Sequence, residues 1–287
     1  MQRGVAASGS LPASGSLSAS GSVAARLSPA ASGSLAPPGA TPAVQLTEVS
    51  KLYGKGRSSV LALDKVSLTV APGEFVCLIG ASGCGKSTML ALVAGLDAPT
   101  GGIVSTGGQR VTLMFQEPAL FPWLTATRNV ELALRARGVP KQERRGRAAE
   151  LLRAVHLGDF GDKRPHELSG GMRQRVAMAR ALAQDVDVLL MDEPFGALDA
   201  MTRDLLHDEL ERICDERGLT VLFVTHNVRE AARLGDRVIL LSSRPGRVIE
   251  EITVDVRHPR RMDSPEIAEL AGHMTDRLRK EMASHGA

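Results

Sequence analysis

The sequence is poor in cysteine and in long apolar runs, and each shortage excludes a class of protein. Its three cysteines are odd in number and lack the spacing of metal ligands, which argues against a disulfide scaffold and a zinc module. Cysteines this sparse fit a reducing cytoplasmic compartment. The apolar runs are only a few residues long, too short to span a bilayer. A role at a membrane would therefore require a partner protein.

Acidic residues are absent before Glu48, where low-complexity sequence prevails. The tetrapeptide Ala-Ser-Gly-Ser recurs four times there, mixed with proline and alanine. Such a segment cannot bury enough apolar surface to offset chain entropy, so residues 1–43 are expected to form a disordered extension. It lacks the continuous apolar core of a signal peptide; a transit peptide is the alternative. Residues 48–287 carry a net charge of only +1, a poor electrostatic footprint for nucleic acid.

From Val44 onward, short apolar runs typical of strands alternate with segments of helical periodicity. This alternation predicts a mainly parallel sheet with helices on both faces. The continuous apolar runs "FVCLIG" and "VTLMFQ" are expected to be buried strands. A helical block over residues 117–168 interrupts the alternation. The other predicted strands are "VQLTEVSKLY", "VLALDKVSLTV", "VDVLLMD", "TVLFVT" and "RVILLS", and the predicted helices span 86–95, 125–138, 140–158, 171–184, 200–217, 227–234 and 264–282.

Residues 80–88, "GASGCGKST", place three glycines and a lysine between a predicted strand and a predicted helix. Gly80 to Ser87 fits the pattern G-x-x-x-x-G-K-[ST] in the context that a phosphate-binding loop requires; the alternative is a plain glycine-rich turn. Glycines let backbone N–H groups approach phosphate oxygens, and the helix start adds its positive end. Lys86 is expected to reach the β- and γ-phosphates, and the Ser87 hydroxyl to bind Mg²⁺. The residues expected to contact nucleotide here are Gly80, Ser82, Gly83, Cys84, Gly85, Lys86, Ser87 and Thr88, with Cys84 as a small filler.

Two acidic residues follow the buried run in "VDVLLMDEP". Asp192 ends that run, so its carboxylate is expected at the C-terminal edge of the sheet near the phosphate loop, acting on Mg²⁺ through water. Glu193 points elsewhere and is the expected general base for the attacking water. The alternative interpretation is a pair of surface acids after a strand, which the nearby phosphate loop disfavours.

The segment "LSGGMRQRVAMARAL" resembles the signature motif of ATP-binding cassette (ABC) ATPases. A glycine pair that opens a second helix makes a second anion site, away from the first. One chain cannot fold both sites onto one nucleotide. In the family, the signature of one subunit completes the ATP site of another, so the resemblance implies a head-to-tail homodimer in which Ser169, Gly170 and Gly171 contact the partner's ATP.

Further residues resemble other family motifs, and their roles are implied by that resemblance. Gln116 in "MFQEP" resembles the glutamine that senses the γ-phosphate and Mg²⁺, and Asp199 in "GALD" the aspartate that communicates across the dimer. His226 in "VTHN" resembles the switch histidine that contacts the γ-phosphate; a satisfied histidine at a strand end is its alternative. Tyr53 in "KLYG" resembles the aromatic residue that stacks on adenine. The implied catalytic residues are Glu193, His226 and Gln116, and the implied Mg²⁺ ligands are Ser87, Gln116 and Asp192.

The resemblance covers residues 44–287. It implies an α/β fold with a P-loop NTPase (RecA-like) core, a mainly parallel sheet, a small antiparallel β region and an inserted α-helical subdomain at about 117–168. The expected organisation is a disordered extension, an ABC ATPase cassette over 44–245, and a C-terminal strand and helix over 246–287 that pack on the cassette.

Local matches such as "MDEPFGALDAMTR" and "SSRPGRVIEEITVDVRHPR" resemble the ATPase subunits of nitrate/sulfonate/taurine-type importers. This resemblance implies ATP hydrolysis at the cytoplasmic face of the membrane, with integral-membrane permease subunits and an extracytoplasmic solute-binding protein. The apolar stretch Ala119–Leu124 would suit docking of a permease; ordinary packing is its alternative. The basic run over 257–261 is expected to be a solvated surface run. The alternative function is a non-transport ABC-type ATPase acting on DNA or ribosomes.

Overall fold

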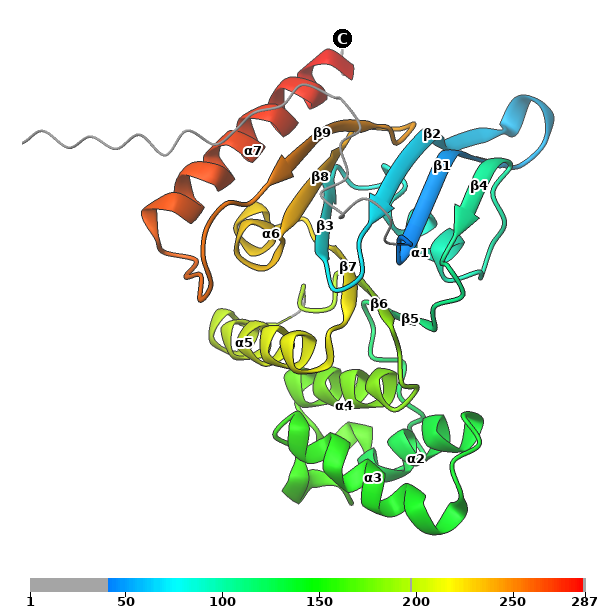
Figure 1. Ribbon diagram of the computed structural model, residues 1–287, viewed down its shortest axis with the longest axis vertical. Coiled ribbons are helices and arrows are strands. Elements are labelled where there is room, and N and C mark those ends of the chain that lie inside the picture. The colour runs from blue at the N-terminus through cyan, green and yellow to red at the C-terminus, as the bar shows by residue number, and fades with distance from the viewer. Residues whose placement is uncertain (1–40, 197, 286–287) are drawn as a thin grey trace, which may run out of the picture.

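The structure is a computed structural model, which describes residues 41–196 and 198–285. The predicted disordered extension lies outside the described residues, apart from its last three positions. Two β-sheets and seven α-helices are arranged within the described part of the chain (Figure 1).

The smaller sheet is antiparallel and lies toward the N-terminal end of the described chain. Its three strands, in the order β2-β1-β4, are β1 Val44–Tyr53, β2 Val60–Val70 and β4 Gly101–Ser105. The larger sheet has the order β5-β6-β7-β3-β8-β9. The strands β5, β6, β7, β3 and β8 run parallel to one another, whereas β9 is antiparallel to β8. The strands of the larger sheet are β3 Phe75–Gly80, β5 Val111–Met114, β6 Val188–Asp192, β7 Thr220–Val224, β8 Arg237–Leu241 and β9 Val248–Thr253.

Each face of the larger sheet has its own core, because side chains alternate along a strand. In β3, Val76 and Leu78 pack toward the smaller sheet and α1 (Lys86–Val93). Cys77 and Ile79 pack on the opposite face, against the other helices. The parallel strands β3, β6, β7 and β8 are therefore buried on both sides, as their continuous apolar sequence predicts.

The helical block over residues 117–168 contains α2 (Ala126–Ala136) and α3 (Lys141–Ala154). The helix α4 (Gly170–Leu182), which follows the block, packs on both of them at the same end of the molecule (Figure 1). Local signals set the ends of these helices: the Thr125 side chain caps α2, and Gly138, with a φ of 85°, follows it. The remaining helices are α5 (Ala200–Arg217), α6 (Val228–Leu234) and α7 (Pro265–His285), and the 3₁₀ turns are Gly56–Ser58, Gly158–Phe160 and Pro165–Glu167.

One expectation about burial is wrong, and another fails at a single residue. The strand in "VTLMFQ" is β5, which pairs only with β6 at the edge of the sheet; Met114 is buried, but Phe115 is exposed. In the basic run, Arg260 is buried rather than solvated. Its guanidinium donates hydrogen bonds to four backbone carbonyls, those of Arg233, Gly235, Val254 and Val256. Arg260 therefore fastens the chain after β9 to the end of α6.

Among the residues that the structure describes, no helix is long and apolar enough to cross a bilayer.

Candidate nucleotide-binding and hydrolysis site

The loop between β3 and α1 needs glycine at specific positions. Gly83 and Gly85 have φ angles of 76° and 99°, in the left-handed region that glycine adopts without steric cost. A Cβ atom on Gly85 would lie 2.8 Å from the carbonyl oxygen of Ala62. A Cβ atom on Gly80 would lie 2.7 Å from the sulfur of Cys84. The chain can close into this compact loop only because these side chains are missing, which leaves a concave cradle of backbone groups.

The ammonium group of Lys86 lies inside this cradle. Its Nζ donates hydrogen bonds to the carbonyl oxygens of Gly80 (2.9 Å) and Ala81 (3.1 Å). Within the described residues no side chain caps α1, and its first turn contains no acidic residue. Unpaired N–H groups at a helix start and a lysine beside them favour an anion. Burial raises the pKa of the Cys84 thiol, which keeps this side chain uncharged beside the predicted phosphate site.

The acidic pair lies at the C-terminal edge of the same sheet. Asp192 ends β6 and is paired in register with Val224, the last residue of β7. Glu193 has a φ of 46°, a left-handed conformation that costs roughly 1–2 kcal/mol for a residue other than glycine. Its N–H donates to the carbonyl oxygen of Val224 (2.9 Å), which holds this bend in place.

Three of the predicted catalytic residues converge on the turn that follows. The Glu193 carboxylate lies 3.0 Å from Nδ1 of His226. A Cβ atom on Gly196 would lie 3.8 Å both from Nε2 of Gln116 and from Cε1 of His226. Gln116, Glu193 and His226 come from the ends of three different strands, and parallel strands bring those ends to one edge of the sheet.

The signature residues lie in a different part of the fold. Ser169 caps α4 by accepting a hydrogen bond from the N–H of Met172 (3.2 Å). α4 packs on α2, α3, α5 and β5, whereas α1 packs between the two sheets (Figure 1). Asp199 lies close to the signature residues. It is hydrogen-bonded to Thr202, and a Cβ atom on Gly171 would lie only 2.5 Å from Cγ2 of Thr202. Asp199 caps α5 through the N–H and hydroxyl of Thr202, and these bonds lower the pKa of its carboxyl.

Tyr53, at the end of β1, has partners that the sequence did not reveal. Its hydroxyl donates to Asp97 (3.0 Å), and the ammonium of Lys51 donates to the same carboxylate (2.6 Å). The Lys51 Nζ also lies 4.9 Å from the centroid of the Tyr53 ring. The hydrogen bond from Lys51 is the main reason why the pKa of Asp97 is lowered. Tyr53 is thus an exposed ring held in one orientation.

The stretch Ala119–Leu124 forms an ordered loop with exposed aromatic side chains. The rings of Phe121 and Trp123 lie 5.6 Å apart, and Trp123 is 67% exposed. The buried Asn129 side chain accepts from the N–H of Phe121 (2.9 Å) and donates to the carbonyl oxygen of Thr125 (3.0 Å). Arg180 of α4 donates to the carbonyl oxygens of Pro118 and Ala119.

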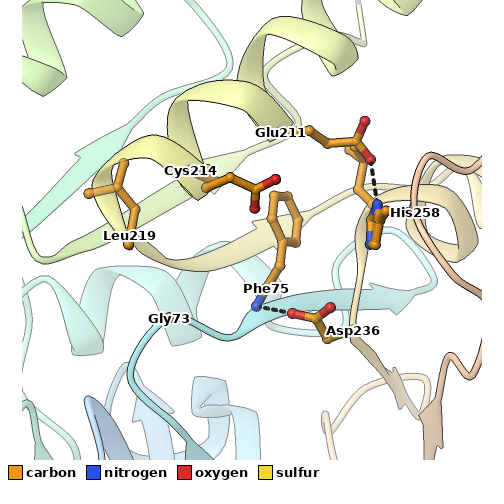
Figure 2. Close-up of a pocket in the computed structure, with 10 residues that line it drawn as sticks. Gly73, Phe75, Glu211, Cys214, Leu219, Asp236 and His258 are labelled. Atoms are coloured by element: carbon orange, nitrogen blue, oxygen red, sulfur yellow. Dashed lines mark hydrogen bonds and ion pairs between the residues drawn. The ribbon is translucent and has the colours of Figure 1, made fainter.

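A cavity of about 230 Å³ lies at the opposite, N-terminal edge of the parallel strands (Figure 2). Two of the carboxylates that line it lie close to other groups of the fold. Asp236 accepts from the N–H of Phe75 (2.9 Å), and Glu211 lies 3.4 Å from Nδ1 of His258. Burial raises the pKa of the Cys214 thiol, so no nucleophile is available there at neutral pH. This cavity is separate from the residues that converge on Gly196.

A glycine loop that cradles a lysine, next to an acidic pair and a histidine at one sheet edge, defines a nucleoside triphosphate hydrolase of the P-loop class. Residues 63–196 match the family model described as "ABC transporter". The chain is 46% identical to the nitrate import ATP-binding protein NrtD of Synechocystis over 220 residues, 74% of this chain and 83% of that protein. It therefore belongs to the ABC family of ATP-binding transport subunits.

Other relatives and solved structures agree with this assignment. The taurine import ATP-binding protein TauB of Burkholderia thailandensis is 46% identical over 72% of this chain and 83% of its own. The bicarbonate transport ATP-binding protein CmpC of Synechococcus elongatus is 49% identical, but only 33% of its length is covered. The dimeric ATP-binding cassette MJ0796, bound to ADP and Pi after hydrolysis, matches with a TM-score of 0.66 and 37% identity, over 75% of this chain and 100% of that one.

Proposed function

We propose that this protein is the ATP-hydrolysing subunit of an importer for a small anion, and that it works as a head-to-tail dimer bound to membrane permease subunits. The observation that carries the proposal is the convergence of Gln116, Glu193 and His226 at the sheet edge next to the lysine loop. The names of the relatives, which specify nitrate, taurine and bicarbonate, support a small anion as cargo without selecting one.

In this proposal, Lys86 and the amides of the loop bind the triphosphate, and the ring of Tyr53 stacks on the adenine. The residues fit Mg²⁺ because the Ser87 hydroxyl, the Gln116 side-chain carbonyl and the Asp192 carboxylate all offer oxygen, the ligand atom that Mg²⁺ prefers. When bound, Mg²⁺ neutralises charge on the β- and γ-phosphate oxygens. The glycine loop formed at Gly80, Gly83 and Gly85 supports binding of the triphosphate, and the three oxygen donors support binding of Mg²⁺.

Glu193 acts as the general base in this proposal. Its carboxylate accepts the proton of the attacking water. His226, 3.0 Å away, orients the carboxylate and contacts the γ-phosphate. Ser169, Gly170 and Gly171 of a second copy complete the site, so that ATP bridges two subunits and its hydrolysis releases them.

The aromatic loop Ala119–Leu124 is the proposed docking surface for a permease at the cytoplasmic face of the membrane. Exposed, pre-oriented aromatic side chains are typical anchors of protein interfaces. Asn129 and Arg180 fix the backbone of this loop before any partner arrives, which lowers the entropy lost on binding. An extracytoplasmic solute-binding protein would deliver the anion to the permease from the other side.

The test is purification of a tagged Glu193→Gln protein, with ATP, from detergent-solubilised membranes of its own host. This variant is expected to bind ATP, lose turnover and remain a closed dimer. Recovery of a polytopic permease of importer type supports the proposal, and its binding-protein partner then identifies the anion. A soluble homodimer without any membrane protein, or salt-dependent binding to DNA or ribosomes, would favour a non-transport ATPase instead. An unchanged hydrolysis rate would contradict the role of Glu193.

A further inference from the structure

A buried polar cluster lies directly behind His226. It comprises His207 of α5, Thr225 at the end of β7, and Glu230 and Arg233 of α6, which are 0%, 2%, 5% and 5% exposed. Burying polar groups costs free energy unless every group has a partner. None of these four residues belongs to the site built above, yet Thr225 is the direct neighbour of the histidine in the chain.

The cluster fixes the backbone on both sides of His226. The Thr225 hydroxyl donates a short hydrogen bond to the Glu230 carboxylate. The same hydroxyl oxygen accepts a hydrogen bond from the N–H of Asn227 (3.0 Å). The Asn227 side chain in turn accepts from the N–H groups of Arg229 and Glu230 and caps α6. Residues 225 and 227 are therefore both held by α6.

His207 ties this arrangement to α5. Its Nε2 lies 2.6 Å from the other oxygen of Glu230, and its Nδ1 lies 3.2 Å from the guanidinium of Arg233. A guanidinium can only donate, so Nδ1 must accept and Nε2 carries the proton. His207 is thus a neutral imidazole that connects a carboxylate with a guanidinium. Arg233 also donates to Asp208 of α5, the helix that Asp199 caps.

The ring of His226 itself has little support. It is 65% exposed, and within the described residues the partner recorded for it is the Glu193 carboxylate. Because most of the ring is exposed, its position depends largely on the backbone that carries it.

We propose that Thr225, Glu230 and His207 are positioning residues for ATP hydrolysis: they hold the backbone of residues 225–227 so that the imidazole of His226 stays at the Glu193 carboxylate. This inference rests on the proposed role of His226 in hydrolysis. It also gives α5, whose first turn lies beside the signature, a rigid connection to the histidine.

The matched variants are Thr225→Val and Thr225→Ser. Valine keeps the shape of threonine but removes the hydroxyl that joins Glu230 and Asn227, whereas serine retains it. Thr225→Val is expected to lower kcat by about tenfold to a hundredfold, the effect of a small misplacement of a catalytic group, with the KM for ATP unchanged. Thr225→Ser is expected to retain most of the native kcat, because serine keeps the hydroxyl. Thermal melting establishes that both variants are folded at the assay temperature.

The decisive measurement repeats Thr225→Val in a His226→Ala background, using single-turnover phosphate release to detect slow hydrolysis. If Thr225 acts by positioning His226, the second substitution changes the rate less than about twofold, because coupled residues are not additive. If Thr225→Val lowers the rate equally in the native and the His226→Ala backgrounds, the positioning role of Thr225 is overturned, whereas the proposed role of His226 is unaffected. If His226→Ala leaves turnover intact, the proposed role of His226 fails as well.

A second variant, Glu230→Gln, covers the case in which Thr225→Val does not fold. It keeps the size of the side chain, but it replaces one acceptor oxygen with an amide that faces a donor. The same dependence on His226 is expected: a loss of kcat in the native background, and a change of less than about twofold once His226 is absent. Equal losses in both backgrounds again overturn the inference.

Discussion

Glycine precedes helix α1 and opens helix α4, and both helices lack an acidic residue in their first turn, yet their N-termini are built differently. α1 follows a fully buried strand, and Lys86 in its first turn is buried within the loop. α4 begins directly after the helical block, with Ser169 and Gly170 exposed and Ser169 as its cap. The first N-terminus has a buried cation inside its glycine loop. The second has its amides, a hydroxyl and the guanidinium of Arg173, which already donates to the carbonyl oxygen of Leu168 (2.7 Å).

This difference indicates which N-terminus can bind a phosphate alone. A helix N-terminus contributes roughly half a unit charge, which is modest when it is exposed to water. The lysine and the glycine cradle supplement that charge at α1, whereas α4 offers an open surface. An open surface of this kind suits a ligand that is already held by another copy of the chain. Four substitutions separate the roles of the two N-termini.

The largest effect is expected from Lys86→Met, which removes the cation from the stronger N-terminus. Binding of ATP, measured by calorimetry, should become undetectable in the micromolar range, and hydrolysis should fall at least about 100-fold, the loss typical of a charge-stabilising group. Lys141→Met, which changes an exposed lysine on α3, is the control and should retain both activities. Tight ATP binding by Lys86→Met would mean that the two N-termini differ less than their structures suggest.

Gly170→Asp should separate binding from turnover. A Cβ atom at Gly170 meets only ordinary contacts of 3.7 Å or more, unlike one at Gly171, so the variant should fold. The positive end of the helix dipole also stabilises an acidic residue in the first turn. The new carboxylate should repel the partner's ATP and lower hydrolysis by about 100-fold, while an isolated subunit still binds ATP. Normal hydrolysis by a folded Gly170→Asp protein would remove α4 from the site.

Ser169→Ala tests how much of the second N-terminus is structural. Loss of the cap on α4 should destabilise the protein by about 1 kcal/mol, measured by denaturant unfolding. Ser169→Asp should keep the cap and the stability, but it should impair hydrolysis by placing a negative charge near the partner's ATP. Equal hydrolysis by the two variants would indicate that Ser169 serves only as a cap.

The smallest effect on nucleotide chemistry is expected from Trp123→Ala, because Trp123 is exposed and belongs to neither N-terminus. ATP binding should be unchanged, whereas association with membranes, measured by co-sedimentation, should weaken. Loss of ATP binding together with membrane association would instead favour a packing role for the loop. Leu96→Ala, which shortens another exposed apolar side chain, provides the control.

Local rules made much of the fold predictable from the sequence. The buried runs of β3, β6, β7 and β8 are continuous and apolar, as parallel strands are, and the helix of residues 200–217 matches α5 in full. The phosphate loop was also predictable, because its glycines and lysine are neighbours in the chain. These features depend on residues that are close in sequence.

Features that depend on long-range pairing were not predictable. The edge position of β5 follows from the strand order, which no single segment encodes. The burial of Arg260 requires four carbonyls, from the end of α6 and from the chain that follows α6 and β9, to meet at one point. The contact of Asp97 with Tyr53, and that of His207 with Glu230, join residues 44 and 23 positions apart. Each side chain looked ordinary until the fold brought its partner close.

The strand β3 has a further consequence for how the molecule opens in solution. Every residue of β3 is buried and the strand pairs on both sides, so its amide protons should exchange with solvent only when the whole core unfolds. Ser169 and Gly170, which are exposed at the start of α4, require only local opening to exchange. The phosphate loop is therefore anchored to the longest-lived part of the protein, and the signature to a part that can fluctuate on a much shorter timescale.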